Sequence, residues 1–403
     1  MATPEKVLRN HFYLEFDESS NSDIRKIKMY LLKKLELPIH ESLFITIGIA
    51  LWGLLRSKRA TTYGLVFVIQ LSLMGCSQPK GMIFEPLVTP ISWPPPPETA
   101  RIHYVGSLHT DKDLKPAKSF ISGVTESLFG ENPSRSMLTP YSVCGDGENR
   151  IFVCDSNAQL VHVFNLETRK YEQWKPDSTN EAFSQPVGIA YDPDGRLLVS
   201  DSASGVIHVF LNDGEYLGTL GDTSLDKPSG IAIDPIRNRI LVADVETHQI
   251  VSISMIDGEL NERIGERGTS LGQFNFPTNI AIGHDGLIYV SDSLNFRVQV
   301  FSPDFKPLRQ VGEKGDMPGY FSHPKGIAVD KDNRLFVIDS HFESVQIFDS
   351  VGKLLLFFGE EGHNPGQFWL PTGIHIDHSG RIWIADSYNQ RLQVFEYRPE
   401  EHR

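Results

Sequence analysis

Six aspartates recur at similar spacing between residues 155 and 386, and each ends a short apolar segment. A carboxylate can act as an acid, a base or a metal ligand. A single active site would need such a group once rather than in every repeat of a pattern. We therefore interpret all six as structural residues that cap the turn that follows. They are Asp155, Asp201, Asp244, Asp292, Asp339 and Asp386.

Polar and aromatic side chains surround these aspartates. Some follow a repeated Asp, others lie in the connector before a repeated Pro, and Asn279 stands two residues after such a Pro. Aromatic rings beside polar groups are typical of recognition surfaces, although each residue taken singly could be an ordinary loop residue. The candidates for a binding face are Asn157, His248, Asn279, Asn295, Phe296, His323, His341, His363, Trp369, Tyr388 and Asn389.

Motifs of metal or redox chemistry are missing from the sequence. There is no His-Glu-x-x-His and no Cys-x-x-Cys. We therefore predict no catalytic residue, no metal and no cofactor. Cys144 and Cys154 fall on adjacent predicted strands, on the same side of the sheet but diagonal to each other. Two buried free thiols are the preferred prediction, and a disulfide is the alternative.

The elements that position these residues follow from an internal repeat. A template of Pro-x-Gly-Ile-Ala-x-Asp, a turn, an apolar strand and a final Asp occurs six times, with the Pro at 140, 186, 228, 277, 324 and 371. The second copy predicts strands at 187–191, 196–200, 206–210 and 216–220, with Asp192-Pro-Asp-Gly195 as a turn. Four antiparallel strands per period predict an all-β, six-bladed β-propeller.

The sixth copy lacks its fourth strand, because the repeat ends near residue 397. An open ring would leave unpaired strand edges. Residues 101–108 read as the missing strand, so we expect an N-terminal strand to complete the last blade. The propeller then spans residues 101–397. Apolar spacing within 115–130 predicts a short helical insertion.

Two repeats carry a fuller signature, Asp292-Ser-Leu-Asn-Phe-Arg297 and Asp386-Ser-Tyr-Asn-Gln-Arg391. With connectors such as Gly272-Gln-Phe-Asn-Phe-Pro277, they resemble NHL repeats. The resemblance implies a six-bladed propeller of a family consisting mostly of binding modules, with a few enzymes. We interpret Arg297 and Arg391 as residues that bridge neighbouring blades.

A metal-dependent hydrolase or lyase is the alternative function. Propeller lactonases and amidating lyases hold a metal at the centre of the ring with several Asp, Glu, Asn or His side chains. Of the corresponding positions here, only Asn279 offers a plausible ligand. His375 lies on an inner strand, and we interpret it as structural. The six positions are Ser142, Gly188, Gly230, Asn279, Gly326 and Gly373.

An export signal precedes the repeats. The basic residues Arg56, Lys58 and Arg59 are followed by an apolar run and by Leu73-Met-Gly-Cys76. This order resembles the signal peptide and lipobox of exported bacterial lipoproteins, and it implies lipidation of Cys76. Residues 56–76 would be the signal peptide, 77–100 a Pro-rich linker, and 1–55 an extension or a start site assigned too far upstream.

The net charge of the chain and its expected localisation indicate which class of partner it binds. The chain has a net charge of −13, and residues 77–403, with 28 basic and 44 acidic groups, carry −16. Such a surface argues against nucleic acid. We expect a monomeric scaffold that is held by lipid on the periplasmic or cell-surface side of a bacterial membrane. Its expected partner is a protein or peptide of the cell envelope.

Overall fold

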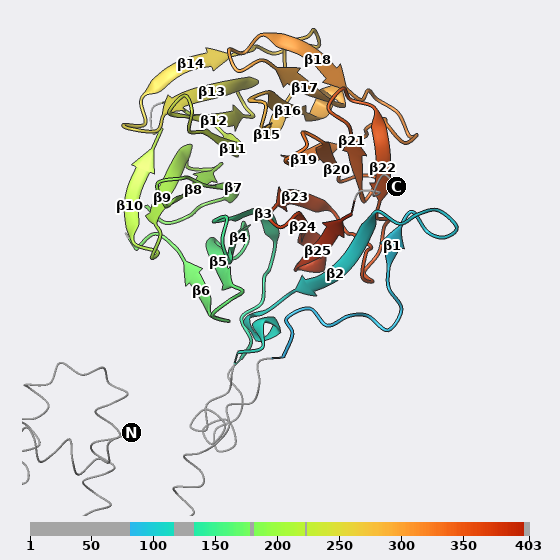
Figure 1. The fold of residues 1–403 in the computed structure, drawn as a ribbon. Helices are drawn as coiled ribbons and strands as arrows, with labels where there is room; N and C mark the ends of the chain where they lie inside the picture. The colour runs from blue at the N-terminus through green and yellow to red at the C-terminus, as the bar shows by residue number, and fades with distance from the viewer. Residues whose placement is uncertain (1–80, 117–132, 178–180, 222–223, 399–403) are drawn as a thin grey trace, which may run out of the picture. The chain divides into compact units, whose positions relative to one another are not determined.

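The computed structural model describes residues 81–116, 133–177, 181–221 and 224–398. Six small antiparallel sheets are arranged in a ring, with the first strand of each repeat innermost (Figure 1). The prediction of a six-bladed β-propeller is confirmed. Within the described residues, no helix has the length and hydrophobicity that a membrane span requires.

The first three blades each contain four strands in chain order. Blade 1 consists of β3 (Pro140–Gly145), β4 (Arg150–Asp155), β5 (Leu160–Asn165) and β6 (Tyr171–Trp174). Blade 2 consists of β7 (Pro186–Tyr191), β8 (Arg196–Asp201), β9 (Val206–Leu211) and β10 (Tyr216–Leu220). Blade 3 consists of β11 (Pro228–Asp234), β12 (Arg239–Asp244), β13 (Gln249–Ser254) and β14 (Leu260–Ile264).

The next three blades follow the same plan until the last. Blade 4 consists of β15 (Pro277–Ile282), β16 (Ile288–Asp292), β17 (Arg297–Phe301) and β18 (Pro307–Val311). Blade 5 consists of β19 (Pro324–Val329), β20 (Leu335–Asp339), β21 (Ser344–Phe348) and β22 (Leu354–Phe358). Blade 6 begins with β23 (Pro371–Ile376), β24 (Arg381–Asp386) and β25 (Arg391–Tyr397).

The turn chemistry predicted for blade 2 is present. Gly195 has a φ of +86°, which an L side chain adopts at a cost. The Asp192 carboxylate accepts a hydrogen bond from the Arg196 amide at 2.7 Å and pairs with the Arg196 guanidinium at 2.6 Å. The predicted strands of this blade differ from the observed ones by no more than a terminal residue.

The small residues of the inner strands allow neighbouring blades to meet. A Cβ atom on Gly373 would lie 2.6 Å from the Ser142 Cα atom of blade 1. A Cβ atom on Gly188 would collide with the Ser229 carbonyl oxygen of blade 3. Packing between inner strands therefore requires glycine at these positions.

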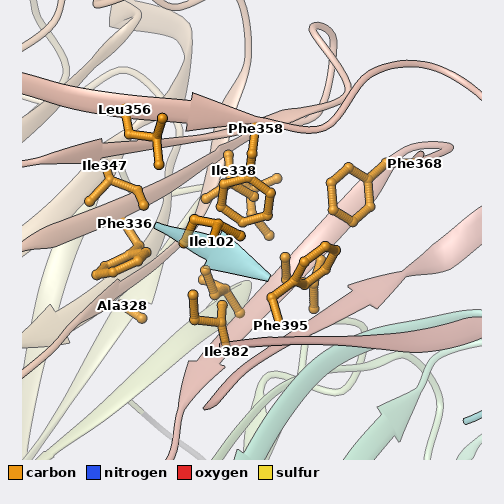
Figure 2. Close-up of a cluster of buried hydrophobic side chains, with 13 residues drawn as sticks. Ile102, Ala328, Phe336, Ile338, Ile347, Leu356, Phe358, Phe368, Ile382 and Phe395 are labelled. Atoms are coloured by element: carbon orange, nitrogen blue, oxygen red, sulfur yellow. The ribbon is translucent and has the colours of Figure 1, made fainter. Parts of the chain in front are cut away.

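An N-terminal strand completes the ring, as the sequence predicted. Strand β2 (Ile102–Leu108) pairs with β25 from Ile102 opposite Tyr397 to Leu108 opposite Leu392, with a shift of register between Tyr104 and Gly106. The Ile102 side chain is fully buried among residues of blades 5 and 6, including Phe358 and Phe395 (Figure 2). A strand from the start of the fold thus shares a core with its end.

Part of the Pro-rich segment, predicted as a linker over 77–100, pairs with the propeller. Strand β1 (Ser92–Trp93) adds a fifth strand outside β2. The Trp93 ring lies 5.7 Å from Phe358 and 5.9 Å from Phe395. Phe84 contacts Trp383 at 6.0 Å. The proline content of the segment predicted a linker, whereas Trp93 and Phe84 pack against aromatic residues of the propeller.

Other predictions fall outside the described residues. The short 3₁₀ helix η1 (Asp111–Leu114) directly precedes the predicted helical insertion, of which residues 117–130 are not described. Cys76 and residues 1–55 also lie outside the described part of the chain. Two further 3₁₀ turns, η2 (Ser293–Asn295) and η3 (Ser387–Asn389), follow repeated aspartates.

Candidate functional site

Each repeated aspartate ends a second strand and accepts hydrogen bonds from the connector that enters its blade. All six side chains are fully buried. Asp155 accepts backbone hydrogen bonds from Leu138, Thr139 and Ala158 at 2.6–3.0 Å. In blade 6, Asp386 accepts one from the Trp369 amide at 2.8 Å. The carboxylates therefore fix the loops that form one face of the ring, which we call the loop face.

A serine after the repeated Asp links one blade to the next, and the sequence analysis missed it. Ser340 donates to the Pro371 carbonyl at 2.5 Å, and Ser387 donates to the Pro140 carbonyl at 2.6 Å. The latter bond joins blade 6 to blade 1. The available signal was the Asp-Ser pair, which occurs in every repeat except the third, where Val245 follows the Asp.

Two asparagines predicted for the binding face take part in this structural network. Asn295 donates to the Gly268 carbonyl and to Asp292, both at 2.8 Å. Asn389 makes the equivalent bonds to Gly362 and Asp386 at 2.9 Å. Their amide groups therefore hold the connector that enters their own blade.

The two repeat arginines have the same connectors as partners. Arg297 donates to Asp292 and to the Ser270 and Gln273 carbonyls at 2.9–3.1 Å. Arg391 repeats the pattern with Asp386 and the connector of blade 6. Each connector runs from the preceding blade into the blade of the arginine. Arg297 and Arg391 therefore link neighbouring blades through hydrogen bonds to the connector rather than to strands of the preceding blade.

A left-handed residue, four positions after the repeated Asp, reaches the next blade. His248 (φ +57°) accepts a hydrogen bond from the Phe276 amide at 3.0 Å through Nδ1. Glu343 (φ +51°) accepts one from the Leu370 amide at 2.7 Å. Glu343 was not among the predicted residues, although His248 and Phe296, which were, occupy the same repeat position.

Burial and neighbouring acids change the charge of Glu343. The pKa of its carboxyl group is raised to about 7, mainly by burial and also by the nearby Asp386, Glu361 and Asp339, against the opposing effect of the Leu370 hydrogen bond. At the equivalent position of blade 3, burial lowers the pKa of His248, and the nearby Arg267 lowers it as well. The junction of blades 5 and 6 thus carries a group that changes charge near neutral pH.

An exposed aromatic group occupies the loop face of blade 6. We call His363, Trp369 and Tyr388 the aromatic patch. The Trp369 ring lies 5.4 Å from Tyr388 and 4.9 Å from His363, which meets it edge-on. The side chains of Trp369 and Tyr388 are 41% and 56% exposed. A bond of 2.6 Å between His363 Nδ1 and Asn389 Oδ1 orients the histidine.

The other predicted binding residues lie elsewhere. Asn157 of blade 1 donates to the Thr139 hydroxyl at 2.7 Å. Phe296 of blade 4 lies 5.0 Å from the Lys314 ammonium. On the central strand β15, Asn279 accepts a hydrogen bond from the Ile280 amide. Asn157, Phe296 and Asn279 therefore belong to other blades than the aromatic patch. Of the predicted set, contacts within the described residues join His363, Trp369, Tyr388 and Asn389 to one another.

The two histidines predicted for blade 5 flank its repeated Asp. The backbone amides of His323 and His341 both donate to Asp339, at 3.1 and 3.0 Å. Burial lowers the pKa of His323, and Lys325 lowers it further. The His341 side chain is exposed, 5.8 Å from Phe342. The backbone contacts of both residues stabilise the loop, and the His341 ring remains available at its surface.

Buried nucleophiles and bases lie away from the aromatic patch. Cys144 and Cys154 are both free and buried, as predicted, and pairing of Ser142 with Cys154 makes the two thiols diagonal neighbours. Burial raises the pKa of both thiols and lowers the pKa of His375 to about 4. In the described residues, no three His, Cys, Asp or Glu side chains are grouped to hold a metal ion.

Comparison with protein families identifies the repeat. A family model of the NHL repeat matches residues 183–210, 274–301 and 368–395. Each match begins at the phenylalanine of a connector and ends in the third strand of blade 2, 4 or 6. The resemblance seen in the sequence motifs is thereby confirmed. No curated protein sequence matches the chain.

Solved structures share the fold at low sequence identity. A gluconolactonase from Xanthomonas campestris is 16% identical, with a TM-score of 0.51 over 65% of this chain and 87% of that chain. An auxiliary nutrient binding protein from Bacteroides ovatus is 13% identical, with a TM-score of 0.52 over 66% and 70%. Virginiamycin B lyase from Staphylococcus aureus is 16% identical, with a TM-score of 0.49 over 65% and 96%. These likenesses concern the fold alone.

Proposed function

Because this chain is a six-bladed β-propeller with NHL repeats, we propose that it is a non-catalytic module that binds a protein or peptide partner. The observation that carries the proposal is the aromatic patch. Two large rings are exposed side by side on loops that buried aspartates hold in place. Rigid, partly exposed Trp and Tyr side chains are the residue types that dominate binding energy at protein interfaces.

The second part of the proposal concerns location. The basic cluster, apolar run and Leu73-Met-Gly-Cys76 support a lipid-anchored protein on the periplasmic or cell-surface side of a bacterial membrane. Intact-mass measurement of the purified protein tests this part. A diacylglyceryl group on an N-terminal Cys76 is expected, and a retained Met1 would contradict it.

Site-specific crosslinking in cells tests the binding function. A photo-crosslinking amino acid at position 388 should capture one defined protein. The same group at position 351, an exposed site on the outer turn of blade 5, should not capture it. Adding Trp369→Ala should abolish the crosslink at 388, and the purified partner should bind the wild-type chain alone.

Two results would count against the proposal. One is equal capture from positions 388 and 351, because that would show no preference for the loop face. The other is a stoichiometric, tightly bound calcium or zinc ion together with hydrolase or lyase activity. That result would support a metal-dependent enzyme instead.

A further inference from the structure

Three connectors on the loop face are structurally equivalent but differ in charge. Each begins with Gly-Glu, and its third residue pairs with the phenylalanine seven positions later. The pairs are Arg267 with Phe274, Lys314 with Phe321, and Glu361 with Phe368. A cation in the connectors of blades 4 and 5 is thus replaced by a carboxylate in the connector of blade 6.

The same position faces the left-handed residue of the preceding blade. Lys314 lies 5.0 Å over the ring of Phe296 of blade 4, which is a cation–π contact. The corresponding residues of the next junction are Glu361 and Glu343, whose like charges repel. The junction of blades 5 and 6 has therefore lost the cation present at the junction before it and has two acids instead.

These acids adjoin the aromatic patch. Glu343 accepts the hydrogen bond of the Leu370 amide, and Leu370 directly follows Trp369. Glu361 lies in the same short connector as His363. Among the described residues, cations stack over several other rings, but none is found over Trp369 or Tyr388. Within the described part of the chain, the exposed rings thus have no cation over them and lie close to two acidic side chains.

We propose that the aromatic patch, with Glu343 and Glu361, binds a lysine or arginine side chain of a peptide segment. The inference rests on the proposed binding function and specifies its partner as a basic peptide. The Trp369 and Tyr388 rings would provide cation–π contact, and the two acids would attract the positive charge. The peptide would thus supply the cation that Arg267 and Lys314 supply in the other two connectors. The net charge of −16 over residues 77–403 favours the approach of such a segment.

Selection from a random twelve-residue peptide library on the detergent-purified full chain tests the inference. Peptides that also bind the Trp369→Ala chain are removed from the library, so that the retained peptides depend on the aromatic patch. Retained peptides should be enriched in Lys or Arg. In synthetic copies, replacing that residue by norleucine should weaken binding about tenfold.

Charge reversal in the protein supplies the matched comparison. Glu361→Lys should weaken binding of the same peptides about tenfold, since the new cation can occupy the site itself. Glu313→Lys changes the charge equally at an exposed connector position of blade 5 and should change binding less than twofold. Glu313→Lys should keep the wild-type unfolding midpoint because its side chain is exposed, and Glu361→Lys should not lower the midpoint because the new cation removes the repulsion with Glu343.

The outcomes separate this inference from the proposed function. Trp369-dependent peptides without Lys or Arg enrichment, with unchanged binding to Glu361→Lys, would overturn the basic partner but leave peptide binding intact. Failure to recover any Trp369-dependent peptide would overturn both. Stoichiometric calcium binding that Glu361→Lys abolishes would assign the charged position to a metal ion, and would also overturn the inference.

Discussion

Glu343 combines a structural contact with an unusual charge state. Its carboxyl group joins blade 5 to the Leu370 amide of blade 6, while burial and nearby acids favour the protonated form. The repeated Asp155 shows the opposite balance. Burial raises the pKa of its carboxyl group, but hydrogen bonds from His162 and from the Ala158 and Leu138 amides outweigh this effect and lower the pKa below its ordinary value.

The raised pKa of Glu343 predicts how stability depends on pH. The folded-state pKa of about 7 exceeds the ordinary value of 4.5, so the group favours folding below pH 4.5. This contribution is lost as the pH rises to 7. Glu343→Gln keeps an acceptor for Leu370 and removes the charge. At pH 8 we expect the variant to exceed the wild type in unfolding free energy by about 1–2 kcal/mol, with little difference at pH 4.5.

Urea denaturation at the two pH values measures the effect. Glu313→Gln, at an exposed position, is the control and should leave the pH dependence of the wild type unchanged. A Glu343→Gln variant with the same advantage at pH 4.5 and pH 8 would show that ionisation of this group is not the cause.

Residues of the loop face illustrate which side-chain roles the sequence could not reveal. Asn295 and Asn389 have the type and loop position of binding residues, yet their amides bond to connector carbonyls. Trp369 has the same kind of position and remains exposed. The difference depends on whether a backbone carbonyl lies within reach, and that follows from the path of the connector in space.

At the scale of elements, the strap from Phe84 to Trp93 extends the fold beyond its predicted start. Strand β1 covers the outer edge of β2, and the Trp93 ring packs against Phe358 of blade 5 and Phe395 of blade 6. The strap therefore reinforces the strand that closes the ring. Prolines around β1 are compatible with this role, because an edge strand needs fewer backbone donors.

Removal of one aromatic ring should reveal the contribution of the strap. We expect Trp93→Ala to lower the free energy of unfolding by about 2–3 kcal/mol, because it leaves a gap between Phe358 and Phe395. Trp369→Ala removes an exposed ring and should cost less than about 1 kcal/mol. Guanidinium denaturation of both variants gives the comparison, and equal losses would mean that the strap contributes no specific packing.

At the scale of the whole molecule, ring closure limits the conformational freedom of the loops, and the net charge influences the approach of a binding partner. The bond from Ser387 to the Pro140 carbonyl and the pairing of β2 with β25 join the last blade to the first part of the fold. The loops therefore stand on a closed scaffold and lose little conformational freedom on binding. The acidic surface adds long-range attraction for a basic segment.

Salt dependence tests this electrostatic contribution. Association of a Lys- or Arg-containing peptide selected as above should slow about tenfold between 50 and 500 mM NaCl, because salt screens attraction between separated charges. Dissociation should change less, since it depends on short-range contacts. Stopped-flow measurements give both rates. An association rate that is independent of salt would show that the net charge does not guide the encounter.

The sequence by itself determined the fold. The repeat of Pro, Gly and Asp positions predicted six blades, and the missing fourth strand of the last blade required closure by residues 101–108, because an open ring exposes strand edges. These conclusions depend on periodic patterns and on the backbone hydrogen bonds that every strand must satisfy, both of which are local properties of the chain.

Only the tertiary structure decided which loop residues are exposed and which charges meet. Three features depend on residues that are separated in sequence or lie in different blades. They are the repulsion between Glu343 and Glu361, the contacts of Trp369 with His363 and Tyr388, and the packing of Trp93 against Phe358. The physical reason is that burial and electrostatic interaction depend on distances between blades, and those distances are fixed only when the ring closes.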